Sequence, residues 1–255
     1  MTRVGIVGVL GRMGAAVRAA VESEPDLVLA AGVERAGHPD LHTSCGEGEV
    51  SASLTEILSR VDVVADFALG DGLAERARAC AGAGRGYVCG VTGLGASAYD
   101  QLKVAARSIP VVYAPNFSVG INLLARLAGE ARRLLGAEYD VEIVETHHRA
   151  KRDAPSGTAA RLLEAILDAA EVSRVRNGRC GLVGAKDPTE VGVHSIRTGD
   201  VVGDHTVILG GPGERIELTH RATGREAFAN GAVRAVRFCV GRTPGLYGMA
   251  DVLRG

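Results

Sequence analysis

Apolar stretches alternate with helical patterns through the first half of the chain, and each apolar stretch ends in small or polar residues. The stretches begin at Val4, Leu27, Val61, Gly86 and Pro110. Helical segments lie between them, for example over residues 73–83 and 97–107. Strands and helices that alternate in this way predict a mostly parallel sheet covered by helices on both faces. We therefore expect a Rossmann-type α/β domain over residues 1–118.

The pattern changes after residue 118. Apolar residues recur at helical spacing at Ile121, Leu124, Ala128, Ala131 and Leu135. Polar and apolar residues alternate over 140–146, which is the period of a strand with one buried face. Further strands are expected at 191–197, 206–209 and 216–220, and a loop is expected over 174–186. This mixture predicts a second, α+β domain over residues 119–227 that carries an open mixed sheet.

A helix over residues 228–240 is the last long element that the pattern predicts. We expect residues 228–255 to return to the first domain. An open sheet in the second domain can be covered by association with other subunits, so we also expect a homo-oligomer.

Composition and charge narrow the possible partners. The chain has 255 residues, of which 46% are hydrophobic and 23% are charged, and its net charge is −1. Near-neutral charge, without a basic stretch interleaved with aromatic residues, argues against nucleic acid as the main partner. No apolar run approaches the roughly 20 residues that span a bilayer, so no membrane association is expected.

The start of the chain and its cysteines indicate a reducing compartment. Met1 leads into the first strand without the pattern of a signal peptide, which favours the cytoplasm. The five cysteines are odd in number and lack Cys-x-x-Cys spacing, so we expect reduced thiols.

A glycine turn joins the first strand to a helix that has Val17 and Val21 on one face. Its sequence is Gly8-Val-Leu-Gly-Arg-Met-Gly14. Strand, glycine turn and helix in this order place a pyrophosphate on the N–H groups of the helix start. The expected cofactor contacts are Gly8, Val9, Leu10, Gly11, Arg12 and Met13. The spacing Gly-x-x-Gly-x-x-Gly departs from the usual Gly-x-Gly-x-x-Gly, and a plain glycine-rich turn is the alternative.

Two charged residues end the second strand. Glu34 follows Gly14 by twenty residues and can accept the ribose hydroxyls of an adenosine; a solvated strand-end charge is the alternative. Arg35 can pair with a 2′-phosphate, so NADH and NADPH both remain open as cofactors. Residues beyond two later strands are candidates for the nicotinamide end, because ligands bind beyond the carboxyl ends of such strands. They are Gly90, Val91, Thr92, Ala114, Pro115, Asn116 and Phe117.

The segment from Glu145 to Thr158 concentrates groups that transfer protons or bind anions. His147 and His148 stand where the predicted strand ends. Pro155 stops any earlier helix, and Ser156 has the side-chain oxygen that caps a new one. The buried side of that helix is expected to consist of Leu162, Leu163, Ile166, Leu167 and Ala170.

The start of this helix predicts an anion site. Free N–H groups at Ser156, Gly157 and Thr158 would face the loop, and helix starts attract negative charge. Four cationic or titratable side chains add to the same field: His148, Arg149, Lys151 and Arg152. We interpret this as a site for a small anion such as a carboxylate.

Lys151 stands out because only three of the 29 basic residues are lysines. A lysine can be tuned to donate a proton, whereas an arginine keeps its proton at any usable pH. His147 and Lys151 are therefore the candidate catalytic residues; a lysine placed by chance and structural histidines are the alternatives. No metal site is expected, because adjacent histidines on a strand end point in opposite directions and no further ligand lies nearby.

With these residues in view, the chain resembles the 4-hydroxy-tetrahydrodipicolinate reductase family, long called dihydrodipicolinate reductases. The resemblance covers nearly the full length. It is carried by residues 8–14, 114–120, 145–159, 199–205 and 228–234. The histidine segment is specific to that family, and the glycine turn is not.

The resemblance implies nicotinamide-dependent reduction of a cyclic six-membered dicarboxylate in the diaminopimelate and lysine pathway. It implies that His147 donates or accepts a proton and that Lys151 donates one. It also implies that His148, Gly157 and Thr158 hold a substrate carboxylate, and that the protein is a tetramer built through the sheets of its second domain.

Three positions depart from the family pattern. Ala150 stands where many members have a histidine or another basic residue, and Ala68 replaces a threonine. Val91 replaces a threonine in the Gly-Thr-Thr-Gly loop, which removes a hydroxyl near the cofactor and leaves the nucleotide preference open.

The mechanism that we expect is hydride transfer to an α,β-unsaturated imine while Lys151 and His147 share the protonation of the neighbouring carbon. One rival is a dehydrogenase of the aspartate or homoserine type, which shares the two-domain plan and an anionic substrate. Another rival is a non-catalytic regulator that senses NAD(P), and such a protein would need no titratable cluster.

Overall fold

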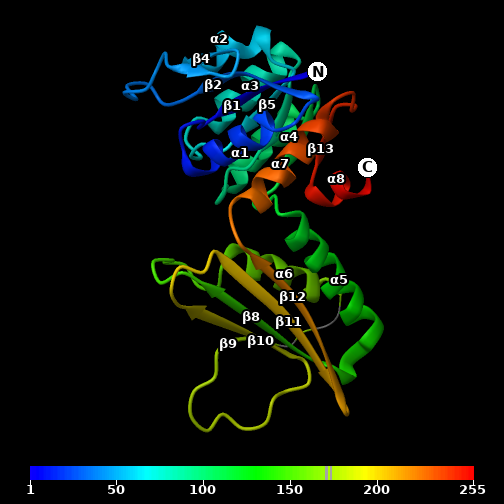
Figure 1. The fold of residues 1–255 in the computed structure, drawn as a ribbon. Coiled ribbons are helices and arrows are strands. Elements are labelled where there is room, and N and C mark those ends of the chain that lie inside the picture. The colour runs from blue at the N-terminus through cyan, green and yellow to red at the C-terminus, as the bar shows by residue number, and fades with distance from the viewer. Residues whose placement is uncertain (170–171, 173) are drawn as a thin grey trace. The chain divides into compact units, whose positions relative to one another are not determined.

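The computed structural model describes residues 1–169, 172 and 174–255. The chain forms two compact units (Figure 1). One comprises Met1–Val119 together with Arg225–Gly255, and the other comprises Gly120–Gly224. The first contains a mostly parallel sheet and the second a mixed sheet, so the predicted fold class is confirmed.

The sheet of the first unit has the strand order β13-β7-β6-β5-β1-β2-β4-β3. Its strands are β1 (Thr2–Val7), β2 (Leu27–Val33), β3 (Ser44–Cys45), β4 (Gly48–Ser51), β5 (Val63–Asp66), β6 (Gly86–Cys89), β7 (Pro110–Tyr113) and β13 (Gly245–Tyr247). All neighbouring strands are parallel except β3 and β4. The carboxyl ends of β1, β2, β5, β6 and β7 therefore share one edge, where ligands bind in sheets of this kind.

Helices cover both faces of this sheet, and each face has its own apolar core. One core includes residues of α1 (Arg12–Glu22), α7 (Glu226–Cys239) and α8 (Met249–Arg254). The other includes residues of α2 (Leu54–Ile57), η1 (Leu58–Arg60), α3 (Leu73–Ala83) and α4 (Ala96–Ala105). Adjacent residues of β5 point into opposite cores, so nearly the whole strand is apolar.

The second unit has a mixed sheet with the strand order β12-β11-β8-β10-β9. Its elements are α5 (Val119–Leu135), η2 (Gly136–Glu138), β8 (Asp140–His147), α6 (Gly157–Leu167), β9 (Arg174–Asn177), β10 (Glu190–Arg197), β11 (Gly203–Gly211) and β12 (Glu214–Ala222). β8, β10 and β9 are parallel, and β11 is antiparallel to both β8 and β12. Residues of α5 and α6 form one apolar core with the inward residues of β8, β10 and β11.

Some predictions about local structure were wrong. The predicted loop over 174–186 contains β9, which pairs with β10. Its polar sequence, Arg-Val-Arg-Asn, did not indicate a strand. Leu167 was expected on the buried side of α6 but is 40% exposed, because it is the last residue of that helix. Ala170, expected on the same side, lies outside the described residues.

The sequence pattern also missed short elements. β3, β4 and β13 have two to four residues each, too few for a recognisable period. Over residues 1–169, 172 and 174–255, no helix combines the length and apolar character needed to cross a membrane.

Candidate active site

The glycine turn after β1 has a backbone that only glycine accommodates at two positions. Gly8 has a φ of +75°, and its N–H donates to the carbonyl of Val33 at 2.8 Å. A Cβ on Gly14 would lie 2.0 Å from the carbonyl oxygen of Gly8, so α1 and the turn are in backbone contact. The turn can therefore approach a ligand closely while remaining packed on the helix.

The start of α1 is arranged for an anion. Gly11 is its N-cap and supplies no side-chain hydrogen bond, and the first turn carries no acidic residue. The N–H groups of a helix start and the helix dipole both favour negative charge.

Glu34 lies at the carboxyl end of β2 and reaches this turn. Its Oε2 accepts the N–H of Leu10 at 3.3 Å, and its Oε1 accepts the N–H of Arg35 at 3.0 Å. The Arg35 side chain is exposed. Glu34 and Arg35 therefore stand together at the edge of the glycine turn.

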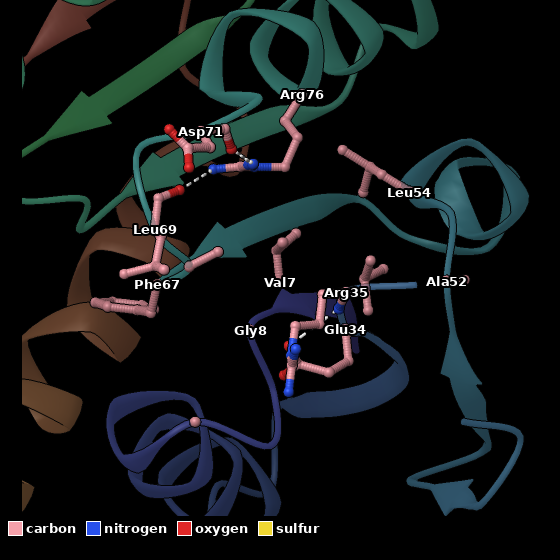
Figure 2. A pocket seen from close by; sticks show the side chains of 13 residues that line it. Val7, Gly8, Glu34, Arg35, Ala52, Leu54, Phe67, Leu69, Asp71 and Arg76 are labelled. Atoms are coloured by element: carbon pink, nitrogen blue, oxygen red, sulfur yellow. Dashed lines mark hydrogen bonds between the residues drawn. The ribbon is translucent and has the colours of Figure 1, made fainter. Parts of the chain in front are cut away.

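These residues line one cavity of about 560 Å³ in the first unit, and Figure 2 shows its lining. Four residues that the sequence analysis placed in the cofactor site line this cavity: Gly8, Gly11, Glu34 and Arg35. Val9 was also predicted to contact the cofactor, but the residue is 1% exposed and its side chain belongs to the core.

Sequence reasoning missed Arg76, which shapes the far wall of the cavity. Its guanidinium donates to Asp66 Oδ2 at 2.6 Å. It also donates to the carbonyls of Asp71 at 2.6 Å and Leu69 at 2.9 Å (Figure 2). Asp66 is fully buried and also accepts the N–H of Ala68 at 3.0 Å. This clamp holds the loop between β5 and α3 in a fixed conformation.

The candidates for the nicotinamide end follow β6 and β7 and do not line this cavity. Thr92 and Pro115 are exposed, and Asn116 is half-buried. Val91, Ala114 and Phe117 are buried, so their side chains serve packing more than contact with a ligand. The Phe117 ring packs edge-on against Phe67 at 5.6 Å between centroids. A Cβ on Gly90 would lie 2.2 Å from the same Phe67 ring.

In the second unit, β8 ends in a buried acid–imidazole pair. His147 Nδ1 lies 2.5 Å from Glu145 Oε2, and both side chains point to the same side of the strand because they are two residues apart. Glu145 is fully buried and His147 is 8% exposed. Sequence reasoning named Glu145 only as the start of a reactive segment; its spacing of two from His147 was the available signal.

Arg197, at the end of β10, forms an ion pair with Glu145. Its Nη1 and Nη2 donate to the two carboxylate oxygens of Glu145, each at 2.8 Å. Burial by itself would raise the pKa of Glu145, but the hydrogen bonds from Arg197 and His147 outweigh it and lower the pKa to about 2. Glu145 is therefore ionised at neutral pH.

His147 is surrounded by further buried polar groups. Its ring packs edge-on against His205 of β11, with 5.1 Å between centroids, and His205 Nε2 lies 3.1 Å from Ser156 Oγ. Burial lowers the pKa of His147, and it lowers the pKa of His205 to about 3. Both imidazoles are therefore neutral at neutral pH.

The start of α6 differs in one respect from the prediction. Ser156 caps the helix, as expected, by accepting the N–H of Ala159 at 3.1 Å. The N–H of Ser156 was predicted to be free, which was wrong: it donates to Glu145 Oε1 at 3.2 Å. The buried carboxylate needs this donor, and it thereby fixes α6 to the end of β8. Gly157 is exposed beside it, and Thr158 is half-buried.

The loop between β8 and α6 carries the cations. Lys151 Nζ lies 2.9 Å from both carboxylate oxygens of Asp153, and its side chain is 20% exposed. His148, Arg149 and Arg152 are exposed. Basic groups and the start of α6 thus lie along one short loop. Within the described part of the chain, no group of three or more His, Cys, Asp or Glu residues could hold a metal ion.

Family models match almost the whole chain. The model described as "Dihydrodipicolinate reductase, N-terminus" matches residues 2–117, and "Dihydrodipicolinate reductase, C-terminus" matches residues 120–253. The 4-hydroxy-tetrahydrodipicolinate reductase of Anaeromyxobacter dehalogenans strain 2CP-1 is 46% identical over 264 residues, covering 99% of this chain and 98% of the relative. The Myxococcus xanthus enzyme of the same name is 43% identical over 267 residues, with 99% and 98% covered.

Solved structures with a similar fold include a member of the same family. The dipicolinate-bound dihydrodipicolinate reductase of Paenisporosarcina sp. TG-14 has a TM-score of 0.83 at 26% identity, covering 98% of this chain and 99% of the other. Aspartate semialdehyde dehydrogenase II of Vibrio cholerae has a TM-score of 0.57 at 14% identity, covering 94% and 98%, and therefore shares the fold alone. The resemblance seen in the sequence is confirmed, and the chain belongs to the dihydrodipicolinate reductase family.

Proposed function

We propose that this chain reduces 4-hydroxy-tetrahydrodipicolinate to tetrahydrodipicolinate with NADH or NADPH, a step in diaminopimelate and lysine biosynthesis. As a member of its family, the protein is an NAD(P)H-dependent oxidoreductase. The observation that carries the proposal is the buried array of Arg197, Glu145 and His147 at the end of β8. A protein that only senses nucleotide has no use for such an array, because perturbed titratable groups gather where protons move.

The first unit fits a dinucleotide. Gly8, Gly11 and the start of α1 would hold its pyrophosphate, and Glu34 would accept its ribose hydroxyls. Val9, Leu10, Arg12 and Met13 complete the turn, and residues 90–92 and 114–117 would lie near the nicotinamide. The bound nicotinamide supplies a hydride.

The close contact between Gly14 and Gly8 gives a test of this site. We expect Gly14→Ala to reduce NADPH affinity severely, because its Cβ would lie 2.0 Å from a backbone carbonyl and would push the turn out of position. Gly82→Ala is the control, since this exposed glycine of α3 lies outside the proposed nucleotide site and nothing lies within 4 Å of a Cβ at its position, so NADPH affinity should stay unchanged. Calorimetric titration with NADPH measures both. Equal affinity of the Gly14→Ala variant and the unchanged protein would contradict the proposed contact.

The cations beside α6 would hold the substrate. His148 and the N–H groups of Gly157 and Thr158 are proposed to bind a carboxylate of the cyclic dicarboxylate. His148 and Gly157 are exposed and so can be reached by a ligand. The related structure with bound dipicolinate supports a small dicarboxylate ligand.

Lys151 is the better candidate for the proton donor. Its Nζ donates to both carboxylate oxygens of Asp153, whereas burial lowers the pKa of His147 and leaves its imidazole neutral at pH 7. A neutral imidazole is a proton acceptor on the nitrogen that lacks hydrogen. We therefore assign proton donation to Lys151 and acceptance or relay to His147.

The same proposal includes a cytoplasmic homotetramer that associates through the sheet of the second unit. Several apolar side chains on or beside its strands are more than a third exposed: Val175, Ile196, Val202 and Ile216. Apolar surface gathered on an open sheet favours contact with another subunit.

The assay that tests the function follows NADH and NADPH absorbance with freshly generated 4-hydroxy-tetrahydrodipicolinate. We expect oxidation of at least one nucleotide, and competitive inhibition by pyridine-2,6-dicarboxylate. Nucleotide oxidation only in the presence of an aspartate semialdehyde would instead support a dehydrogenase of the aspartate or homoserine type. Nucleotide binding without oxidation of the nucleotide by any substrate would support a non-catalytic regulator.

A further inference from the structure

The Arg197 side chain forms hydrogen bonds with three segments of the second unit. Its Nη1 donates to Glu145 Oε2 at 2.8 Å and to the carbonyl of Ile196 at 2.7 Å. Its Nη2 donates to Glu145 Oε1 at 2.8 Å and to the carbonyl of Asp153 at 2.6 Å. One guanidinium thus joins β10, the buried acid of β8 and the loop that carries Lys151.

The strand register explains why Arg197 can do this. β10 pairs with β8 in parallel, and Arg197 lies opposite His147 in that pairing. The backbone continues the connection, because the N–H of Thr198 donates to the carbonyl of His147 at 2.9 Å. The N–H of Arg149 donates to the carbonyl of Gly199 at 3.2 Å. The ends of both strands and the loops beyond them form one hydrogen-bonded unit.

The Glu145 contact fixes the tautomer of His147. An ionised carboxylate only accepts hydrogen bonds, so His147 Nδ1 carries the hydrogen at 2.5 Å from Glu145. Nε2 of the neutral ring is then a bare acceptor. That nitrogen lies close to Gly203, where a Cβ would approach it to 3.0 Å, so a larger residue at this position would crowd the ring.

The contact of Arg197 with Asp153 concerns the second proposed proton-transfer residue, Lys151. Asp153 Oδ1 and Oδ2 each lie 2.9 Å from Lys151 Nζ, and the carbonyl of the same residue is held by Arg197. Fixing this carbonyl restricts the loop on which the ammonium stands. A displacement of about 1 Å in such a group can cost on the order of 10²-fold in rate.

We propose that Arg197 is a positioning residue that orients both proton-handling groups: through Glu145 it holds His147 with hydrogen on Nδ1 and a free Nε2, and through Asp153 it holds the loop of Lys151. This inference rests on the proposed function and adds two residues to it, Arg197 and Glu145. Neither needs to touch substrate.

Removal of Arg197 has a predictable effect on the titration of His147. The charged or titratable groups around that ring are Glu145 on its own strand, Arg197 on β10, His205 on β11 and Lys151 on the loop. Arg197 and Lys151 lower the pKa of His147, and Glu145 raises it. Without Arg197 the ring therefore gains a proton more easily, and the neutral form that acts as an acceptor begins at higher pH.

The test compares Arg197→Gln and Arg197→Lys with the control Arg221→Gln, whose guanidinium lies on β12 and is 73% exposed. We expect Arg197→Gln to lower kcat by about 10²-fold and to move the acidic limb of the kcat profile to higher pH. Arg197→Lys keeps the positive charge but cannot donate to both carboxylate oxygens in the same way. Its acidic limb should therefore lie close to that of the unchanged protein, while its kcat stays reduced. NADPH affinity should stay unchanged in all three.

A second measurement separates this inference from the function itself. A nitrogen NMR titration of the unliganded protein should show His147 protonated on Nδ1 at pH 7, and it should show the second proton binding at higher pH in Arg197→Gln than in the unchanged protein. That readout requires no turnover, so it stands even if the unchanged protein fails to oxidise NADPH with the proposed substrate. Folded Arg197 variants with unchanged pH profile and unchanged His147 signals would overturn the positioning role, whatever their kcat.

Discussion

Replacing Lys151 with alanine should lower kcat at least about 100-fold, because positioned acid catalysis is worth roughly 10² to 10⁴ in rate. The affinity for NADPH should change little, since no residue of the predicted nucleotide site comes from this loop. Steady-state kinetics and calorimetric titration measure the two effects separately.

The chain offers close controls for Lys151. Lys103 also pairs with an aspartate, at 2.9 Å, but lies in the first unit and is exposed, so Lys103→Ala should leave kcat unchanged. His148→Ala should mainly raise KM, because His148 is proposed to hold charge that the substrate already carries in the ground state. Normal turnover of Lys151→Ala would remove this lysine from the mechanism.

Replacing Glu145 with alanine should destabilise the second unit by roughly 3 to 5 kcal/mol, the usual cost of removing one partner from a buried ion pair. Arg197 would lose two of its acceptors, and His147 Nδ1 and the Ser156 N–H would each lose one. Urea denaturation followed by far-UV circular dichroism measures the loss. Glu164→Ala is the control, because its ion pair with Arg161 is exposed and worth about 0.5 kcal/mol or less.

The same carboxylate makes stability depend on pH. The pKa of Glu145 is about 2 in the folded chain against 4.5 for an ordinary glutamate. A lowered pKa stabilises the fold above pH 4.5, by on the order of 3 kcal/mol, and this contribution is lost as pH falls from 4.5 towards 2. Glu142, whose pKa is also about 2 although burial opposes the shift, acts in the same direction.

The buried histidines extend the effect to milder acid. His205 has a pKa of about 3 in the folded chain because burial disfavours its charge, so the unfolded chain binds its proton first as pH falls below 6.5. Because the contribution of Glu145 itself is lost between pH 4.5 and pH 2, unfolding free energies of Glu145→Gln should fall less steeply over that range than those of the unchanged protein. Parallel slopes would show that this carboxylate is not ionised in the folded state.

Local patterns predicted the elements that depend on neighbouring residues. The alternation over 140–146 predicted β8, because one face of that strand is buried. Ser156 was recognised as a cap because its oxygen bonds a residue three positions away. The turn from Gly8 to Gly14 was readable for the same reason: glycine spacing and the following helix lie within one short segment.

Contacts between distant segments were not predictable in this way. Arg197 and Glu145 are 52 residues apart, and His205 and Ser156 are 49 apart. No local period relates such pairs. The register of β8 with β10 and β11 places Arg197 opposite His147 and His205 opposite Glu145, and the N–H of Ser156 donates to the same Glu145. The predicted free N–H of Ser156 was wrong for this reason, since its acceptor became apparent only with the buried face of β8.

The sequence by itself determined the alternating α/β plan, the glycine turn, the acid at the end of β2 and the reactive loop after β8, because each depends on spacing along a short stretch of chain. Only the tertiary structure decided which groups are buried and paired. Burial governs the protonation of Glu145 and His147, and it depends on the parallel pairing of strands whose residues the sequence keeps far apart.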